Sequence, residues 1–283
     1  MTSPSKKPPC LERFRAITAH CFITTPYPRL HDDLHRLLLP QRLQPEIGLE
    51  GNALWHEPGA RFEEAARLLH GCGLAATIHA PFQDLTPGGF DERILDLSRE
   101  KLRRAFALLP LFRPRSIVCH LGYNHQRHRH NLERWLSVST ETWKGLLPLA
   151  QAAGVKVMFE NTYERDPSIH RALFARLEEF SPGFCLDVGH VLAFSSTPWQ
   201  QWLAELGPWL GQLHLHDNDG SSDAHGPIGS GCFDFQGLLQ RLAQDGRRLL
   251  STLEQRSVQD TLSSLAALER FDTAALSGQP LES

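Results

Sequence analysis

The sequence predicts a single α/β domain with the architecture of a (β/α)8 TIM barrel. Short apolar segments rich in β-branched residues alternate eight times with longer amphipathic segments, which is the pattern of consecutive parallel βα units. The chain has 283 residues, a length that one such barrel commonly uses. Hydrophobic residues make up 41% of the chain and charged residues 22%, so it can bury a sizeable core.

The eight predicted strands follow one another along the whole chain. They are residues 15–20, 45–50, 75–80, 116–121, 155–160, 183–188, 211–216 and 249–254. The segments between them have helical periodicity. In residues 91–112, for example, Leu102 and Phe106 recur on one face, whereas Arg103 falls on another. We therefore expect each strand to be followed by a helix that packs on the outside of the barrel.

The barrel is expected to span residues 14–272, with a loose N-terminal tail over 1–13 and a C-terminal tail over 273–283. The chain starts with MTSPSKKPPC, a polar, proline-rich sequence that is unlike a signal peptide. No stretch approaches the roughly 20 apolar residues that a membrane span needs. The formal net charge of −3 gives no overall attraction to DNA or acidic lipid.

The cysteines indicate a reducing compartment. All six are scattered along the chain without CxxC spacing, which is typical of reduced thiols. We therefore expect a cytoplasmic protein, and the composition specifies no oligomeric state.

Polar residues stand at or next to the C-terminal ends of six predicted strands. They are His79, His120, Glu160, Asp187, His214 and Glu254. TIM-barrel enzymes build their active sites at this end of the strands. One histidine there is usually a hydrogen-bonded structural residue, but several converging carboxylates would repel one another without a cation. Imidazole and carboxylate suit Zn²⁺, Mn²⁺ and Fe²⁺, so the sequence predicts a divalent metal centre.

These motifs resemble the AP endonuclease family 2, or xylose isomerase-like, superfamily of TIM barrels over about residues 14–270. The endonuclease IV branch of that superfamily binds three metal ions through nine side chains. The counterparts here are His79 in TIHAPF, His120 in VCHLGY, Glu160 in FENTYE, Asp187 and His190 in LDVGH, His214 in HLHD, Asp223 and His225 in DAH, and Glu254 in TLEQ.

The resemblance implies a trinuclear site, with zinc as the expected metal and Mn or Fe as alternatives. The implied groups are His79, His120 and Glu160 for one ion, Glu160, Asp187, His214 and Glu254 for a second, and His190, Asp223 and His225 for the third. A hydroxide that bridges such ions can attack phosphorus. The main prediction is therefore a metal-dependent hydrolase of a small or nucleotide-like phosphodiester.

The sugar isomerase and epimerase branch of the same superfamily is the alternative prediction. For that branch the resemblance implies a single ion held by Glu160, Asp187, His214 and Glu254. Glu160 and Glu254 would then act as acid and base on the substrate carbon. Several epimerases carry an arginine six residues after the ligand histidine, where this chain has Gly220.

A third prediction is endonuclease IV-like cleavage of DNA, which we favour least. After Asp187 and His190 that branch continues with an alanine-rich segment, whereas this chain reads VLAFSSTP. The basic segment HQRHRH at 125–130 is either a phosphate clamp or a solvated loop. A barrel that binds metal without catalysis also agrees with these residues.

Four further residues are candidates for substrate contact. Asn161 and Tyr163 follow Glu160 and are expected either to orient it or to touch the substrate. His216 follows His214 and is expected to shape the turn or meet the substrate. Trp55 follows the second predicted strand and could provide a stacking wall.

Overall fold

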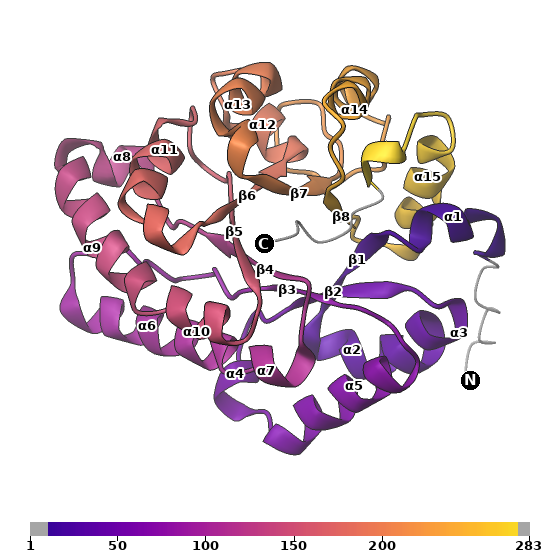
Figure 1. Ribbon diagram of the computed structural model, residues 1–283, viewed down its shortest axis with the longest axis horizontal. Helices are drawn as coiled ribbons and strands as arrows, with labels where there is room; N and C mark the ends of the chain where they lie inside the picture. Colours follow the sequence, from indigo (N-terminus) through magenta and orange to yellow (C-terminus); the bar gives the residue numbers. More distant parts are fainter. Residues whose placement is uncertain (1–10, 277–283) are drawn as a thin grey trace.

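The computed structural model describes residues 11–276, and it shows the predicted single-domain TIM barrel. Eight parallel strands form a closed barrel in chain order, with β8 paired to β1, and helices surround it (Figure 1). The strands are β1 Cys21–Pro26, β2 Gln44–Gly48, β3 Thr77–His79, β4 Ser116–His120, β5 Lys156–Glu160, β6 Gly183–Asp187, β7 Leu210–Leu215 and β8 Leu250–Leu253.

Seven of the predicted strands overlap observed ones, but the first prediction was wrong. Residues Arg15–Thr18 form the short helix α1, and β1 begins only at Cys21. The reason is tertiary pairing, since five residues of β1 find partners in β2 from Phe22↔Gln44 to Pro26↔Gly48. His20 therefore precedes the strand and lies away from its C-terminal end.

The helices vary from single turns to four turns. They are α2 Tyr27–Asp33, α3 Leu39–Gln41, α4 Ala53–His56, α5 Gly59–Gly71, α6 Glu92–Phe106, α7 Leu109–Phe112, α8 His125–His128, α9 Leu132–Lys144, α10 Leu147–Ala152, α11 Ser168–Arg176, α12 Val188–Phe194, α13 Trp199–Leu206, α14 Phe235–Gln244 and α15 Val258–Leu268. A π-helix, η2 Leu34–Leu38, continues α2, and short 3-10 segments are η1 Glu12–Phe14, η3 Arg129–Asn131, η4 Glu178–Phe180, η5 Gly207–Trp209 and η6 Ala274–Leu276.

The longest helix, α6, lies within the predicted segment 91–112 and illustrates why these segments are helical. The Asp91 carboxylate accepts hydrogen bonds from the backbone N–H groups of Arg93 and Ile94, which satisfies donors of the first turn. Leu102 and Phe106 are buried on the inner face of the helix. The amphipathic pattern therefore fixes which side of α6 packs on the barrel.

Two apolar layers result from the alternation of side chains along each strand. The main core lies between strands and helices and includes Phe159 and Leu186. A small separate cluster of Val118, Met158 and Cys185 lies on the opposite face of the strands, inside the barrel. Successive residues of a strand point to opposite faces, so the residue two positions after each member of this inner cluster also points inward. Those residues are His120, Glu160 and Asp187.

The predicted tails fall mostly outside the described residues. Within the described part of both tails, Leu11 and Leu276 are buried. The five cysteines among residues 11–276 are free, and Cys72 and Cys232 are exposed. Over the same residues, no helix combines the length and the apolar character that crossing a membrane requires.

Candidate metal centre

The structure brings all nine predicted ligand residues together at the C-terminal end of the barrel. Together with His216 they fall into four groups, three of which share residues, and within each group the ligand atoms lie within 4.8 Å of one another. The groups are Glu160, Asp187, His214 and Glu254; His79, His120 and Glu160; His79, His214 and Glu254; and His190, His216, Asp223 and His225. His216 thus joins a group to which the sequence did not assign it.

The central group consists of Glu160, Asp187, His214 and Glu254, which come from the ends of β5 to β8. His214 is fully buried, and its Nδ1 lies 3.3 Å from Glu160 Oε1 and 3.1 Å from Glu254 Oε1. This nitrogen nevertheless has no hydrogen-bond partner. Three buried carboxylates around one imidazole lack sufficient positive charge of their own, and oxygen and nitrogen donors of this kind fit a divalent cation.

The two glutamates of this group have pKa values that are displaced in opposite directions. Burial raises the pKa of Glu160, but the positive charges of His214 and His120 outweigh it and hold that pKa well below its usual range. Burial also raises the pKa of Glu254. The positive charge of His214 lowers this pKa, but the negative charges of Asp187 and Glu160 raise it further, so it stays above its usual value. Glu160 is therefore the more acidic of the two carboxyl groups.

A residue that the sequence analysis missed, Glu46 on β2, holds the other side of His214. His214 Nε2 lies 3.1 Å from Glu46 Oε1. The second oxygen, Oε2, accepts hydrogen bonds from Thr77 Oγ1 at 2.8 Å, Gln212 Nε2 at 2.8 Å and Thr252 Oγ1 at 3.0 Å. A carboxylate on the far nitrogen of a ligand histidine fixes the ring and its tautomer. The only signal in the sequence was an acidic residue inside an apolar strand.

His79 and His120 surround the outer oxygen of Glu160. The Nε2 atoms of both rings lie 3.1 Å from Glu160 Oε2. His79 Nδ1 lies 3.0 Å from the Ala80 carbonyl oxygen and 3.6 Å from Glu50 Oε1. These two histidines therefore contact Glu160 and line the cavity at the same time.

The group of His190, His216, Asp223 and His225 lies beside the central one. His225 Nε2 donates a hydrogen bond to Asp223 Oδ2 at 3.0 Å, and the rings of His216 and His225 stack at 4.0 Å. His216 Nε2 lies 3.1 Å from both carboxylate oxygens of Asp187. His216 is fully buried and connects this group to the central one.

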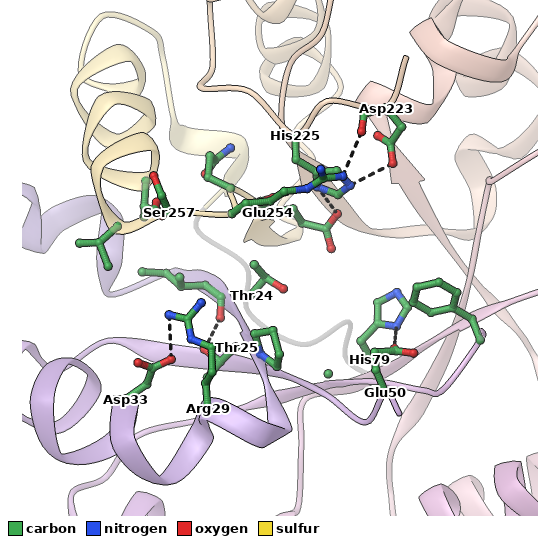
Figure 2. A pocket seen from close by; sticks show the side chains of 18 of the residues that line it. Thr24, Thr25, Arg29, Asp33, Glu50, His79, Asp223, His225, Glu254 and Ser257 are labelled. Atoms are coloured by element: carbon green, nitrogen blue, oxygen red, sulfur yellow. Dashed lines mark hydrogen bonds and ion pairs between the residues drawn. The ribbon is translucent and has the colours of Figure 1, made fainter. Parts of the chain in front are cut away.

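The cavity above these groups has a volume of about 460 Å³ (Figure 2). Glu50, His79, Asp223, His225 and Glu254 line it together, as Figure 2 shows. Further residues from the predicted ligand set in the wall are His120, Glu160 and His190. The cavity therefore gives a small molecule direct access to both glutamates.

The predicted substrate-contacting residues are placed differently from one another. Tyr163 lines the cavity, is 56% exposed and packs on Phe194. Asn161 is buried and exchanges two hydrogen bonds with the Asp187 backbone, at 2.9 and 2.8 Å, so it holds the end of β6. Trp55 lies under the Arg104 guanidinium and is not among the residues that line the cavity.

The basic segment at 125–130 does not line the cavity either. It forms α8 and the start of η3. His128 is buried, stacks on Trp135 and accepts a hydrogen bond from the Asn124 backbone N–H. Part of this segment is therefore structural.

Comparison with known proteins finds relatives and solved structures that cover most of this chain. MJ1311, an uncharacterized protein of Methanocaldococcus jannaschii, is 25% identical over 201 residues, which make up 69% of either chain. The TTHB071 protein from Thermus thermophilus, solved after soaking with ZnCl₂, is 28% identical with a TM-score of 0.77, over 92% of this chain and 99% of that one. A D-tagatose 3-epimerase-like protein is 21% identical with a TM-score of 0.76, over 90% and 98%.

These comparisons correct the prediction of phosphodiester hydrolysis, which was wrong. Solved structures with this fold are named as sugar epimerases, including enzymes for L-ribulose and D-psicose. They agree better with the alternative prediction, and the endonuclease IV-type ligand set is not confirmed. The physical reason is that histidine and carboxylate ligands serve both chemistries, so ligand identity alone does not specify the substrate.

The family match agrees with the strands and the site. The family described as the xylose isomerase-like TIM barrel matches residues 46–272, which include β3 to β8 and every residue of the four groups. On this match, the chain belongs to the xylose isomerase-like TIM barrel family.

Proposed function

We propose that this protein is a metal-dependent sugar isomerase or epimerase that acts on a small carbohydrate. The observation that carries the proposal is the central group, in which Glu160 and Glu254 approach the same imidazole nitrogen from two strands. A divalent ion such as zinc, held by Glu160, Asp187, His214 and Glu254, would polarise the carbonyl and hydroxyl oxygens of the substrate. Manganese and iron suit the same donors.

The two glutamates would move the proton of the reacting carbon. Both line the cavity, so a sugar bound there meets both carboxyl groups. Glu160, the more acidic group, accepts the proton that lies next to the carbonyl, and Glu254 returns a proton in the second half of the reaction. Return to the opposite face gives an epimer, whereas return to the neighbouring carbon gives an isomer.

Aromatic rings wall the same cavity. Phe82 stacks on His120 with ring centroids 4.2 Å apart, and Phe194 packs on Tyr163 at 4.8 Å. Apolar faces of this kind suit the C–H faces of a sugar ring and limit the access of water. The epimerase names of several structures with this fold support the same reaction class.

The test is solvent hydrogen exchange. The zinc- or manganese-loaded chain is incubated in D₂O with D-fructose, D-tagatose and L-ribulose, and NMR follows deuterium at the carbon next to the carbonyl. Exchange should fall by about 10²- to 10⁴-fold in Glu160→Gln and in Glu254→Gln. Glu205→Gln, a surface change in an ion pair with Arg171, is the matched control. No exchange with any ketose or aldose by a metal-bound chain would refute the proposal.

Metal content separates the proposed single-ion site from the predicted trinuclear one. Elemental analysis should find about one ion per chain after dialysis, whereas about three would favour the trinuclear cluster. His214→Ala should abolish binding of this ion. His225→Ala removes a residue of the neighbouring group that also lies 2.8 Å from the Glu254 carbonyl oxygen but is not one of the four proposed ligands, so it should keep the ion and metal-dependent exchange.

A further inference from the structure

The cavity continues beyond the candidate metal centre into an apolar slot. Its walls come from β1, from η2 and the residue before β2, and from α15, and they consist of Ile23, Leu37, Leu38, Leu43, Val258 and Leu262. Figure 2 shows Arg29 and Asp33 on α2 at one side of the slot and Ser257, just before α15, at the other. The slot and the metal centre are thus two ends of one cavity.

The polar groups near the slot are largely satisfied within the protein. Arg29 and Asp33 form an ion pair at 3.2 Å. The Thr25 hydroxyl donates to the Ile23 carbonyl oxygen at 2.9 Å, so this residue leaves mainly its methyl group for the cavity. The slot therefore offers few hydrogen-bonding groups to a ligand.

This lining does not suit an unsubstituted sugar along its whole length. A monosaccharide carries hydroxyl groups around its perimeter, and each hydroxyl in an apolar wall loses its hydrogen bonds to water. An apolar group in the same place would instead gain from leaving water. The hydroxyl groups of a sugar fit the carboxylates and histidines at the metal centre, whereas the slot fits an apolar group.

We infer that the slot holds an apolar substituent, an alkyl or aryl group, on the sugar that reacts at the metal centre. The inference rests on the proposed function for the sugar end of the ligand. A substituent is the occupant we choose because the slot opens directly into the cavity of the metal centre. The first ten residues, MTSPSKKPPC, lead into Leu11 of the cavity wall, but two lysines and two serines suit an apolar slot poorly.

The test compares two sugar ethers that differ only in chain length and keep the carbonyl group that the proposed reaction needs. Isothermal titration calorimetry of the zinc-loaded full chain measures the Kd of 6-O-methyl and 6-O-n-hexyl D-fructose, both below the micelle-forming range. Full burial strengthens binding about fourfold per methylene, so incomplete burial of the hexyl chain still predicts at least about a tenfold lower Kd. Equal Kd values would overturn the inference.

Two variants show whether the slot is the cause. Leu37→Gln and Leu262→Gln change half-buried wall residues outside the metal groups and should remove most of the preference for the hexyl ether. Leu97→Gln, 55% exposed on α6, is the matched control and should keep it. A preference that is unchanged in both slot variants would mean binding elsewhere and would overturn the inference.

Removal of residues 1–10 tests the competing occupant. If the preference for the hexyl ether appears only in this shortened chain, the N-terminal residues fill the slot and the inference is wrong. The deuterium-exchange assay keeps the two proposals separate. If the chain catalyses deuterium exchange but binds both ethers equally, only the inference about the slot is wrong. If the chain prefers the hexyl ether but catalyses exchange on no sugar, only the proposed function is wrong.

Discussion

Replacement of Glu46 by glutamine should weaken metal binding although Glu46 is not a ligand of the proposed ion. In the native chain, Glu46 Oε1 lies 3.1 Å from His214 Nε2, and a carboxylate this close favours a proton on that nitrogen, which leaves Nδ1 free to bind the ion. In Glu46→Gln the oxygen can still accept from Thr77, so the amide NH₂ faces His214. His214 must then accept at Nε2 and carry its proton on Nδ1, which blocks the ligand atom.

The expected effect is a metal Kd about 10- to 100-fold higher, the usual result of removing a carboxylate behind a ligand histidine. This corresponds to about 1.4 to 2.7 kcal/mol of binding free energy. The assay is competition for Zn²⁺ against a fluorescent chelator at pH 7. A melt of the metal-free protein by circular dichroism shows whether the variant is folded.

Glu50→Gln is the matched control, because Glu50 is a glutamate of the same cavity that faces His79 at 3.6 Å. It should leave the Kd within about threefold of the native value. A native-like Kd in folded Glu46→Gln, or an equal loss in both variants, would refute the tautomer argument.

Three further outcomes are expected. Burial raises the pKa of Glu164 to about 7 from 4.5 in the folded chain, so its contribution to stability is complete below about pH 4.5 and is lost as pH rises through about 7. Glutamine does not titrate, so Glu164→Gln should not lose this stability. In urea unfolding of the metal-free chain, the free energy of unfolding of the variant minus that of the native chain should rise by up to about 3 kcal/mol from pH 5 to pH 8; a pH-independent difference would contradict this. Gly189→Ala places a methyl group against the buried His216 ring and should cost about 1 to 3 kcal/mol, whereas Gly71→Ala, which meets open space, should not; equal melting temperatures would disprove the crowding. Zinc at about 100 times its Kd should stabilise the chain by about 2.7 kcal/mol, seen as a higher Tm that EDTA reverses and that His214→Ala lacks; an identical zinc response in His214→Ala would place the ion elsewhere.

Local pattern was sufficient for most of the barrel. Apolar, β-branched segments located seven strands to within a few residues, because a strand buried on both faces has a distinctive composition. The first strand was misplaced because RAITAH and CFITTP are both plausible strands by composition. Only the pairing of Phe22–Pro26 with β2 decides between them.

The substrate class was harder to predict than the ligands. The same side chains serve a hydrolytic cluster and a single-ion site, so the motifs led to the hydrolase prediction that the comparisons corrected. A cavity wall also selects its ligand, and residues such as Leu37 and Leu262 have no sequence pattern that marks them as wall residues. They line one cavity only because the tertiary fold places α15 and η2 on two sides of it.

The sequence by itself determined the barrel and the polar ends of its strands, since period-two alternation directs His120, Glu160 and Asp187 to the same side as the inner cluster of Val118, Met158 and Cys185. Tertiary structure alone decided the contacts between distant segments. Glu46 reaches His214 across the barrel, and His216 joins His190, Asp223 and His225. Such contacts depend on the closure of eight strands, which no local pattern of residues encodes.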